Sequence, residues 1–176
     1  MTKQLNPDQA LSALASENAT SDKWQSRPLE GSGHQTRWLP VVMPRTFGAP
    51  IGITREGFWA SPTANGLRLL SHEDRGVQLL IAMEYPLDEL RGLLSTIGDE
   101  VGAGPVLLSR FPFQLTIRTA IDTGSEEWIA RALDWLEQDR QLLDHATKML
   151  LKVVTDNKAY DQKLRQRADR LSTTAH

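Results

Sequence analysis

The sequence contains no cysteine. This absence excludes disulfide bonds, thiolate zinc sites, iron–sulfur clusters and a cysteine nucleophile for these residues. It is in keeping with a reducing compartment, and we expect a cytoplasmic protein. Histidine is scarce, with four in the chain, and no two stand three or four residues apart. A helical pair of metal-binding histidines is therefore not expected.

Long hydrophobic runs and an excess of one charge are missing too. No stretch approaches the roughly 18 apolar residues of a membrane span, and the first residues do not resemble a secretory signal. The formal net charge of −2 provides no overall basic field for nucleic acid or anionic lipid. With 40% hydrophobic and 24% charged residues, we expect a soluble globular protein without a membrane partner.

Signatures of catalysis and nucleotide binding are also lacking. The glycine pairs in residues 31–33 and 102–104 do not have the spacing or context of a phosphate-binding loop. The cluster His72, Glu73 and Asp74 is one candidate for metal or acid–base chemistry, although turns readily collect such residues. We expect no catalytic residue, metal or cofactor. An enzyme with a dispersed site near His72 is the least favoured alternative.

What the sequence does contain is a series of short apolar segments separated by turns. A helix is expected near the N-terminus, and residues 19–32 are predicted to form a loop. Trp38–Met43 predicts an edge or irregular strand, because Pro40 lies within it and Pro44 follows it. Residues 48–62 predict a hairpin, and residues 67–70 predict another short strand.

The second half combines predicted strands and helices. Residues 77–83 are apolar on both faces, which indicates a buried central strand, and 87–97 has helical spacing. Strands are predicted at 106–108 and at 113–121, where apolar and polar residues alternate. From Ile129 to Val153 apolar residues recur at helical spacing for about seven turns, which predicts one long helix over 125–155.

The predicted order is α-βββ-α-ββ-α with a long C-terminal helix. Strands and helices mix without strict alternation, which favours an α+β fold with an antiparallel sheet of about five strands and helices packed on it. We expect a single domain overall. Within it, 1–46 would hold the first helix and an irregular Trp- and Pro-containing segment, 47–155 the core, and 156–176 a basic helical or disordered tail.

This order resembles the type III secretion chaperone-like fold, which is also seen in the YbjN family. The segments that carry the resemblance are GVQLLIAMEYP with LDELRGLLSTI, VLLSRFPFQLTIRTAID, and EEWIARALDWL. Proteins of that fold dimerise and hold other proteins. The resemblance therefore implies a homodimer with its interface on the helix that contains Leu90, Leu93, Leu94 and Ile97.

Tryptophan is the unusual residue, with five in the chain. Trp24 and Trp38 lie in the irregular N-terminal part, where a tryptophan either anchors a partner protein or pins its own segment to the core. Both interpretations stay open at this level. Trp24 and Trp38 are thus candidate partner-binding residues.

The C-terminal residues are basic and offer an alternative function. Lys163, Arg165, Arg167 and Arg170 could contact nucleic acid, although interspersed aspartates and a single nearby aromatic ring favour a solvated helix end. We predict a non-enzymatic protein-binding module, such as a chaperone, adaptor or immunity-type inhibitor, that uses exposed sheet and helix surfaces as a homodimer. The alternative is an accessory nucleic-acid-associated subunit.

Overall fold

The computed structural model describes residues 22–46, 48–70, 76–103 and 105–173. The predicted α+β class is confirmed, because one antiparallel five-stranded sheet is combined with helices, and the last element is a C-terminal helix. The expected N-terminal helix falls outside the described residues, as does the cluster at His72.

The chain divides into two compact units. The first contains residues 1–71 and 88–111, and the second contains residues 72–87 and 112–176. The boundary expected after residue 46 falls between two paired strands of the first unit, and the one expected after residue 155 falls within a helix of the second.

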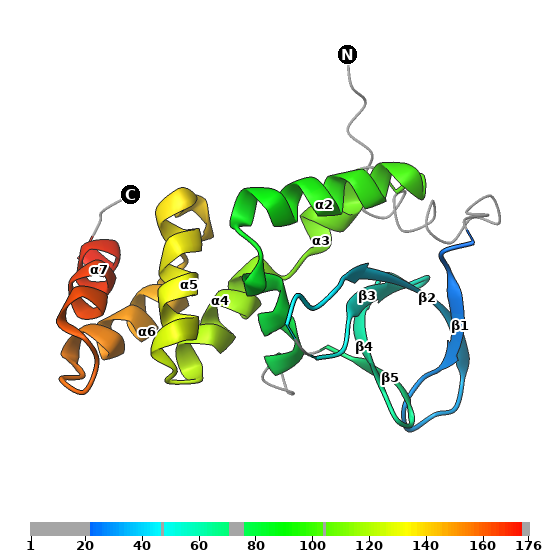
Figure 1. The fold of residues 1–176 in the computed structure, drawn as a ribbon, viewed down its shortest axis with the longest axis horizontal. Helices are drawn as coiled ribbons and strands as arrows, with labels where there is room; N and C mark the ends of the chain where they lie inside the picture. The colour runs from blue at the N-terminus through cyan, green and yellow to red at the C-terminus, as the bar shows by residue number, and fades with distance from the viewer. Residues whose placement is uncertain (1–21, 47, 71–75, 104, 174–176) are drawn as a thin grey trace, which may run out of the picture. The chain divides into compact units, whose positions relative to one another are not determined.

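A small β-barrel forms most of the first unit. Its strands are antiparallel to their neighbours and follow chain order: β1 (Gln25–Pro28), β2 (Gln35–Val42), β3 (Ile51–Thr54), β4 (Trp59–Thr63) and β5 (Gly66–Leu69). Just past β1, the Glu30 amide donates to the Leu67 carbonyl at 2.8 Å, which brings the first and last strands together. Figure 1 shows the sheet curled on itself. Closure pairs backbone groups that an open sheet would leave along its edges.

Trp38 fills the interior of this barrel. It is 1% exposed and packs with Ala60 and Leu67. Its strand β2 pairs with both β1 and β3, so of the two predicted alternatives, an edge or an irregular strand, the structure has the irregular one. Pro40 is tolerated there because the β2–β3 register shifts between Pro40 and Val42, which relieves the ladder where proline donates no hydrogen bond.

The other strand predictions before residue 70 agree closely with the structure. The hairpin expected within 48–62 is β3 with β4, and the strand expected at 67–70 is β5. The short strand β1 lies inside the segment 19–32 that was predicted to be a loop, so that prediction is wrong for these residues. Its exposed side chains lack the apolar alternation that marks a strand in sequence.

Two helices complete the first unit. The predicted helix is α2 (Leu87–Glu100), tied from Asp88 onward to the barrel segments by the ion pairs Arg45–Glu89 and Lys23–Glu100. Helix α3 (Val106–Arg110) replaces a predicted strand. Trp59 fixes it, because its Nε1 donates to the Arg110 carbonyl at 2.9 Å and its ring meets Phe111 edge-on at 5.2 Å.

The second unit is helical in its described part. Its elements are the 3₁₀ helix η2 (Val77–Glu84), α4 (Phe113–Asp122), α5 (Glu126–Gln138), the short η3 (Arg140–Leu142), α6 (His145–Asp156) and α7 (Gln162–Thr173). Helix α5 contacts η2, α4 and α7, while α6 packs against α4 and α7. Among the described residues, none of the helices combines the length and apolarity needed to cross a membrane.

Two predicted strands are helices in this unit. The strand predicted at 77–83 is η2, in which every residue from Leu79 to Met83 is buried. A short run that is apolar on all sides has no periodicity to separate a strand from a buried helix. The strand predicted at 113–121 is α4. Its buried Thr116, Ile117 and Ala120 follow a helical spacing that is hidden when threonine and alanine are counted as polar.

The single long helix predicted over 125–155 is two helices. The chain leaves helical geometry at Asp139, with φ −137° and ψ 100°. It re-enters at Asp144, whose carboxylate accepts the Thr147 amide at 2.7 Å and caps α6. Of the segments that carried the chaperone-like resemblance, LDELRGLLSTI and EEWIARALDWL are helices as expected, whereas GVQLLIAMEYP and VLLSRFPFQLTIRTAID are helical where strands were expected.

Alanine substitutions at two glycines, Gly52 and Gly92, test the packing of the first unit. A Cβ on Gly52 would lie 2.0 Å from the Leu39 carbonyl oxygen, whereas one on Gly92 in α2 meets no atom within 4 Å. We expect Gly52→Ala to lower the free energy of unfolding by roughly 1–3 kcal/mol or to prevent folding. Gly92→Ala should raise it by roughly 0.5–1 kcal/mol, through helix propensity. Urea denaturation checks both, and equal effects would contradict the packing of β3 on β2.

Candidate functional site

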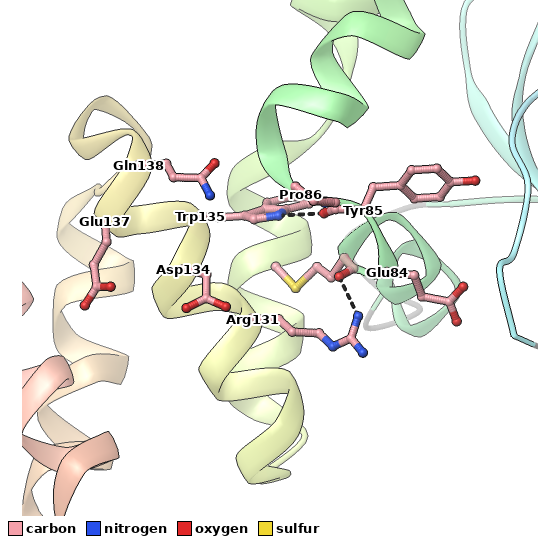
Figure 2. Close-up of a pocket in the computed structure, with 9 residues that line it drawn as sticks. Glu84, Tyr85, Pro86, Arg131, Asp134, Trp135, Glu137 and Gln138 are labelled. Atoms are coloured by element: carbon pink, nitrogen blue, oxygen red, sulfur yellow. Dashed lines mark hydrogen bonds between the residues drawn. The ribbon is translucent and has the colours of Figure 1, made fainter.

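A pocket of about 590 Å³ lies in the helical unit, between the end of η2 and α5 (Figure 2). Residues 83–86 line one side. The α5 side is formed by Arg131, Asp134, Trp135, Glu137 and Gln138. Its volume lies within the range of small-ligand sites in proteins, and its walls combine apolar and charged groups.

Trp135 forms the apolar part of the pocket with Met83 and Pro86. Its side chain is 2% exposed, and its Nε1 donates to the Tyr85 carbonyl at 3.1 Å (Figure 2). The Phe113 ring meets the indole at a steep angle with centroids 6.0 Å apart. The Tyr85 carbonyl and the Phe113 ring thus hold the buried indole in one orientation.

Arg131 secures the other side of the pocket. Its Nη1 donates to the Met83 carbonyl at 2.9 Å, near the end of η2, where carbonyls have no partner inside the helix. Its Nη2 pairs with Glu127 one turn away at 2.9 Å, and the guanidinium lies over Trp128 at 5.2 Å. These contacts make Arg131 a structural bridge between α5 and η2.

Asp134 and Glu137 carry negative charge at the rim and are joined to α7. Arg167 donates to both Glu137 oxygens at 3.0 and 2.8 Å and to Asp134 Oδ1 at 2.5 Å. The hydrogen bond from Arg167 holds the pKa of Glu137 below its ordinary value of 4.5, against the opposing effect of desolvation. This bidentate pairing ties the last helix to α5.

The four cations proposed for nucleic acid lie on this same helix. Arg167 faces the acids of α5, and Arg165 Nε donates to the Tyr160 carbonyl at 3.3 Å. The positive charge of Arg170 also lowers the pKa of Glu137. The Lys163 backbone amide donates to the Asp161 carboxylate at the start of the helix. The segment expected to be a basic tail is thus packed helix, with Leu164, Ala168 and Leu171 buried. Nucleic-acid binding stays a prediction.

The residues proposed for partner binding and self-association are largely inside the chain. Trp24 is 8% exposed and Trp38 is 1% exposed, so their burial agrees with the interpretation that these rings pin their own segment. On α2, Leu90 and Leu94 are fully buried, whereas Leu93 and Ile97 are partly exposed. Dimerisation stays a prediction, and only those last two residues offer side-chain surface for it.

Helix α6 exposes a surface that the sequence interpretation missed. Ala146, Met149 and Val153 stand at i, i+3 and i+7, and all three are exposed, Met149 by 55% and Val153 by 65%. A second row, His145, Lys148 and Lys152, has the same spacing and runs beside the first. The prediction of one long helix over 125–155 placed Ala146 and Val153 on the same apolar stripe as the residues of α5. The break at Asp139 separates α5 from α6, so the exposed residues of α6 do not continue the apolar stripe of α5.

The described residues contain no group of three or more acidic or histidine side chains arranged to hold a metal ion. Comparison of the chain with protein-family models, with curated proteins and with solved structures finds no significant match. Any functional assignment therefore depends on the surfaces and the pocket described above.

The Arg167 cluster predicts a pH-dependent contribution to stability. Because the folded pKa of Glu137 is lowered from 4.5, the contribution is present above that pH and is lost as pH falls through the folded value. Arg167→Ala should lower the free energy of unfolding at pH 7 by about 1 kcal/mol, since solvent screens these pairs. The difference from wild type should shrink in acid. Lys163→Ala is the matched control, and a pH-independent Arg167→Ala effect would contradict the electrostatic role.

Proposed function

We propose that this protein binds another protein, and that the apolar row on α6 is the contact surface. The observation that carries the proposal is the exposure of Met149 and Val153, one turn apart on a helix whose opposite side is packed against α4 and α7. Scattered apolar side chains need no explanation, but aligned ones at i, i+3 and i+7 match the spacing with which helices meet. The row also includes Ala146, whose small side chain lets a partner backbone approach closely.

The charges beside this row specify the partner's chemistry. The exposed Lys152 and the half-buried Lys148 lie on its flank, and Asp156 is the acid at the end of α6. A partner segment that pairs with both rows is an amphipathic helix with apolar side chains on one stripe and carboxylates on the next. The apolar row would supply most of the affinity, while the charges would set orientation and association rate.

This surface serves a chaperone, an adaptor or an inhibitor equally well, and we propose the class rather than one member of it. The homodimer remains part of the proposal and rests on a different surface, the partly exposed Leu93 and Ile97 of α2. The two contacts are separable by mutation because they lie on different helices.

Site-specific photo-crosslinking tests the α6 surface. The full chain carries benzoylphenylalanine in place of Met149, or in place of Asp122, an exposed control position at the end of α4. We expect one protein from a lysate of the source cells to crosslink at the first position and not at the second. The purified partner should then bind wild type with an affinity that Val153→Glu weakens by roughly tenfold or more, and that rising salt also weakens.

Two results would overturn this proposal. One is that the same proteins crosslink at both positions, which marks nonspecific contact. The other is that the reconstituted complex is indifferent to Val153→Glu. If the crosslinked species is a second copy of the chain, α6 is a self-association surface and the proposed acidic partner is rejected.

Light scattering tests the homodimer. We expect a mass of twice the 19.7 kDa chain at micromolar concentration, and the mass of one chain for the double variant Leu93→Lys, Ile97→Lys, because two charges in an apolar contact are left unpaired. Met149→Lys is the control, since it alters an apolar residue on another helix. A one-chain mass for wild type would reject the dimer without affecting the α6 proposal.

A further inference from the structure

The part of the chain that the structure describes holds sulfur in the side chains of Met43, Met83 and Met149. Met83 is 2% exposed, whereas Met43 is 53% exposed and Met149 is 55% exposed. Because the sequence contains no cysteine, the thioethers of methionine are the sulfur groups on which an oxidant can act. A dissolved oxidant reaches a thioether where its side chain is exposed, so Met43 and Met149 are open to it.

Met149 differs from Met43 in its surroundings. It lies within the apolar row of α6, three residues after Ala146 and four before Val153, and both of these neighbours are exposed. Long side chains of a helix lean over the turn that precedes them, and for Met149 that turn contains the small Ala146. A methyl group cannot shield the thioether beside it. Met43, in contrast, directly follows β2 in the first unit.

We propose that Met149 is a site of reversible oxidation by a peroxide, and that its sulfoxide weakens binding at the apolar row of α6. The thioether sulfur attacks hydrogen peroxide and the O–O bond breaks. One oxygen atom becomes bonded to sulfur, and the other leaves with both hydrogen atoms as water. Sulfur thereby loses two electrons. Thiol-dependent methionine sulfoxide reductases reverse the step, since two thiols become a disulfide and the oxygen leaves as water.

The sulfoxide changes the surface of α6 and leaves its packing in place. The S–O group is a hydrogen-bond acceptor, which water satisfies while the side chain is exposed. A partner that covers the row removes this water, and an apolar contact supplies no donor instead. The helix is held from its other side, where Thr147, Leu151 and Val154 are buried. The effect on binding rests on the proposed function, whereas the oxidation itself does not.

Peptide mapping by mass spectrometry tests the oxidation on the full chain alone. After mild treatment with hydrogen peroxide, we expect Met149 to gain one oxygen atom roughly tenfold or more faster than Met83, because a buried sulfur reacts only when the structure opens locally. Methionine sulfoxide reductases for both sulfoxide epimers should then remove that oxygen. Equal rates at the two residues, or a sulfoxide that the reductases leave in place, would overturn the site.

Retention on a hydrophobic column tests the change in the surface without a partner. The comparison is between Met43→Leu and the double variant Met43→Leu, Met149→Leu, which differ only at residue 149. Leucine keeps the apolar character and lacks the sulfur. We expect peroxide to lower the retention of the single variant and not that of the double variant, with the free energy of unfolding of both unchanged in urea. An equal loss of retention in both, or a loss of stability in the single variant alone, contradicts the inference.

The protein captured by the α6 crosslink tests the consequence for binding. Oxidised Met43→Leu should bind it roughly tenfold or more weakly than the reduced form does, because an unpaired acceptor is buried in the contact. The oxidised double variant should keep its affinity, and equal weakening of both overturns the effect on binding. If Met149 is oxidised but no protein is captured at α6, the proposed function fails together with the effect on binding, while the oxidation site is supported by the first two measurements.

Discussion

Two hydrogen bonds from α5 hold the end of η2, and the helical unit depends on them. Trp135 Nε1 donates to the Tyr85 carbonyl, and Arg131 donates to the Met83 carbonyl. Both acceptors lie where a helix ends and its carbonyls need partners from elsewhere. Because both donors come from one face of α5, they set how η2 meets this helix. The same contacts leave a pocket beside them, so the pocket is a consequence of how the unit is built.

The first unit uses tryptophan in a related way. Trp38 fills the barrel, and Trp59 reaches out of β4 to bind the carbonyl of Arg110 and the ring of Phe111. A large apolar body with one donor can both occupy a core and fix a neighbouring segment. Trp24 and Trp38 are likewise buried, whereas Met149 and Val153 on α6 are exposed.

Charged side chains also pair within the fold. The sequence of the last segment, taken alone, is basic and suggests that it binds a polyanion. In the fold, Arg167 turns to Asp134 and Glu137, which stand about thirty residues earlier in the chain. Ion pairs between residues this far apart in the chain cannot be predicted from sequence, because they depend on which helices pack side by side. On α6, the exposed Lys152 stands next to the apolar row of Ala146, Met149 and Val153.

The sequence by itself determined the α+β class, the hairpin of β3 and β4, the strand β5 and the helix α2. These rest on signals that act over a few residues: glycine and proline at turns, short apolar segments between the turns, and helical spacing. Only the tertiary structure decided that 77–83 and 113–121 are helices. Burial of every residue from Leu79 to Met83 leaves no period to identify the first, and the buried Thr116 and Ala120 hide the helical spacing of the second. The pocket was likewise beyond the sequence, because residues 83–86 and α5 meet only through packing. So was the α6 surface, since a capped break at Asp144 changes which apolar residues face outward.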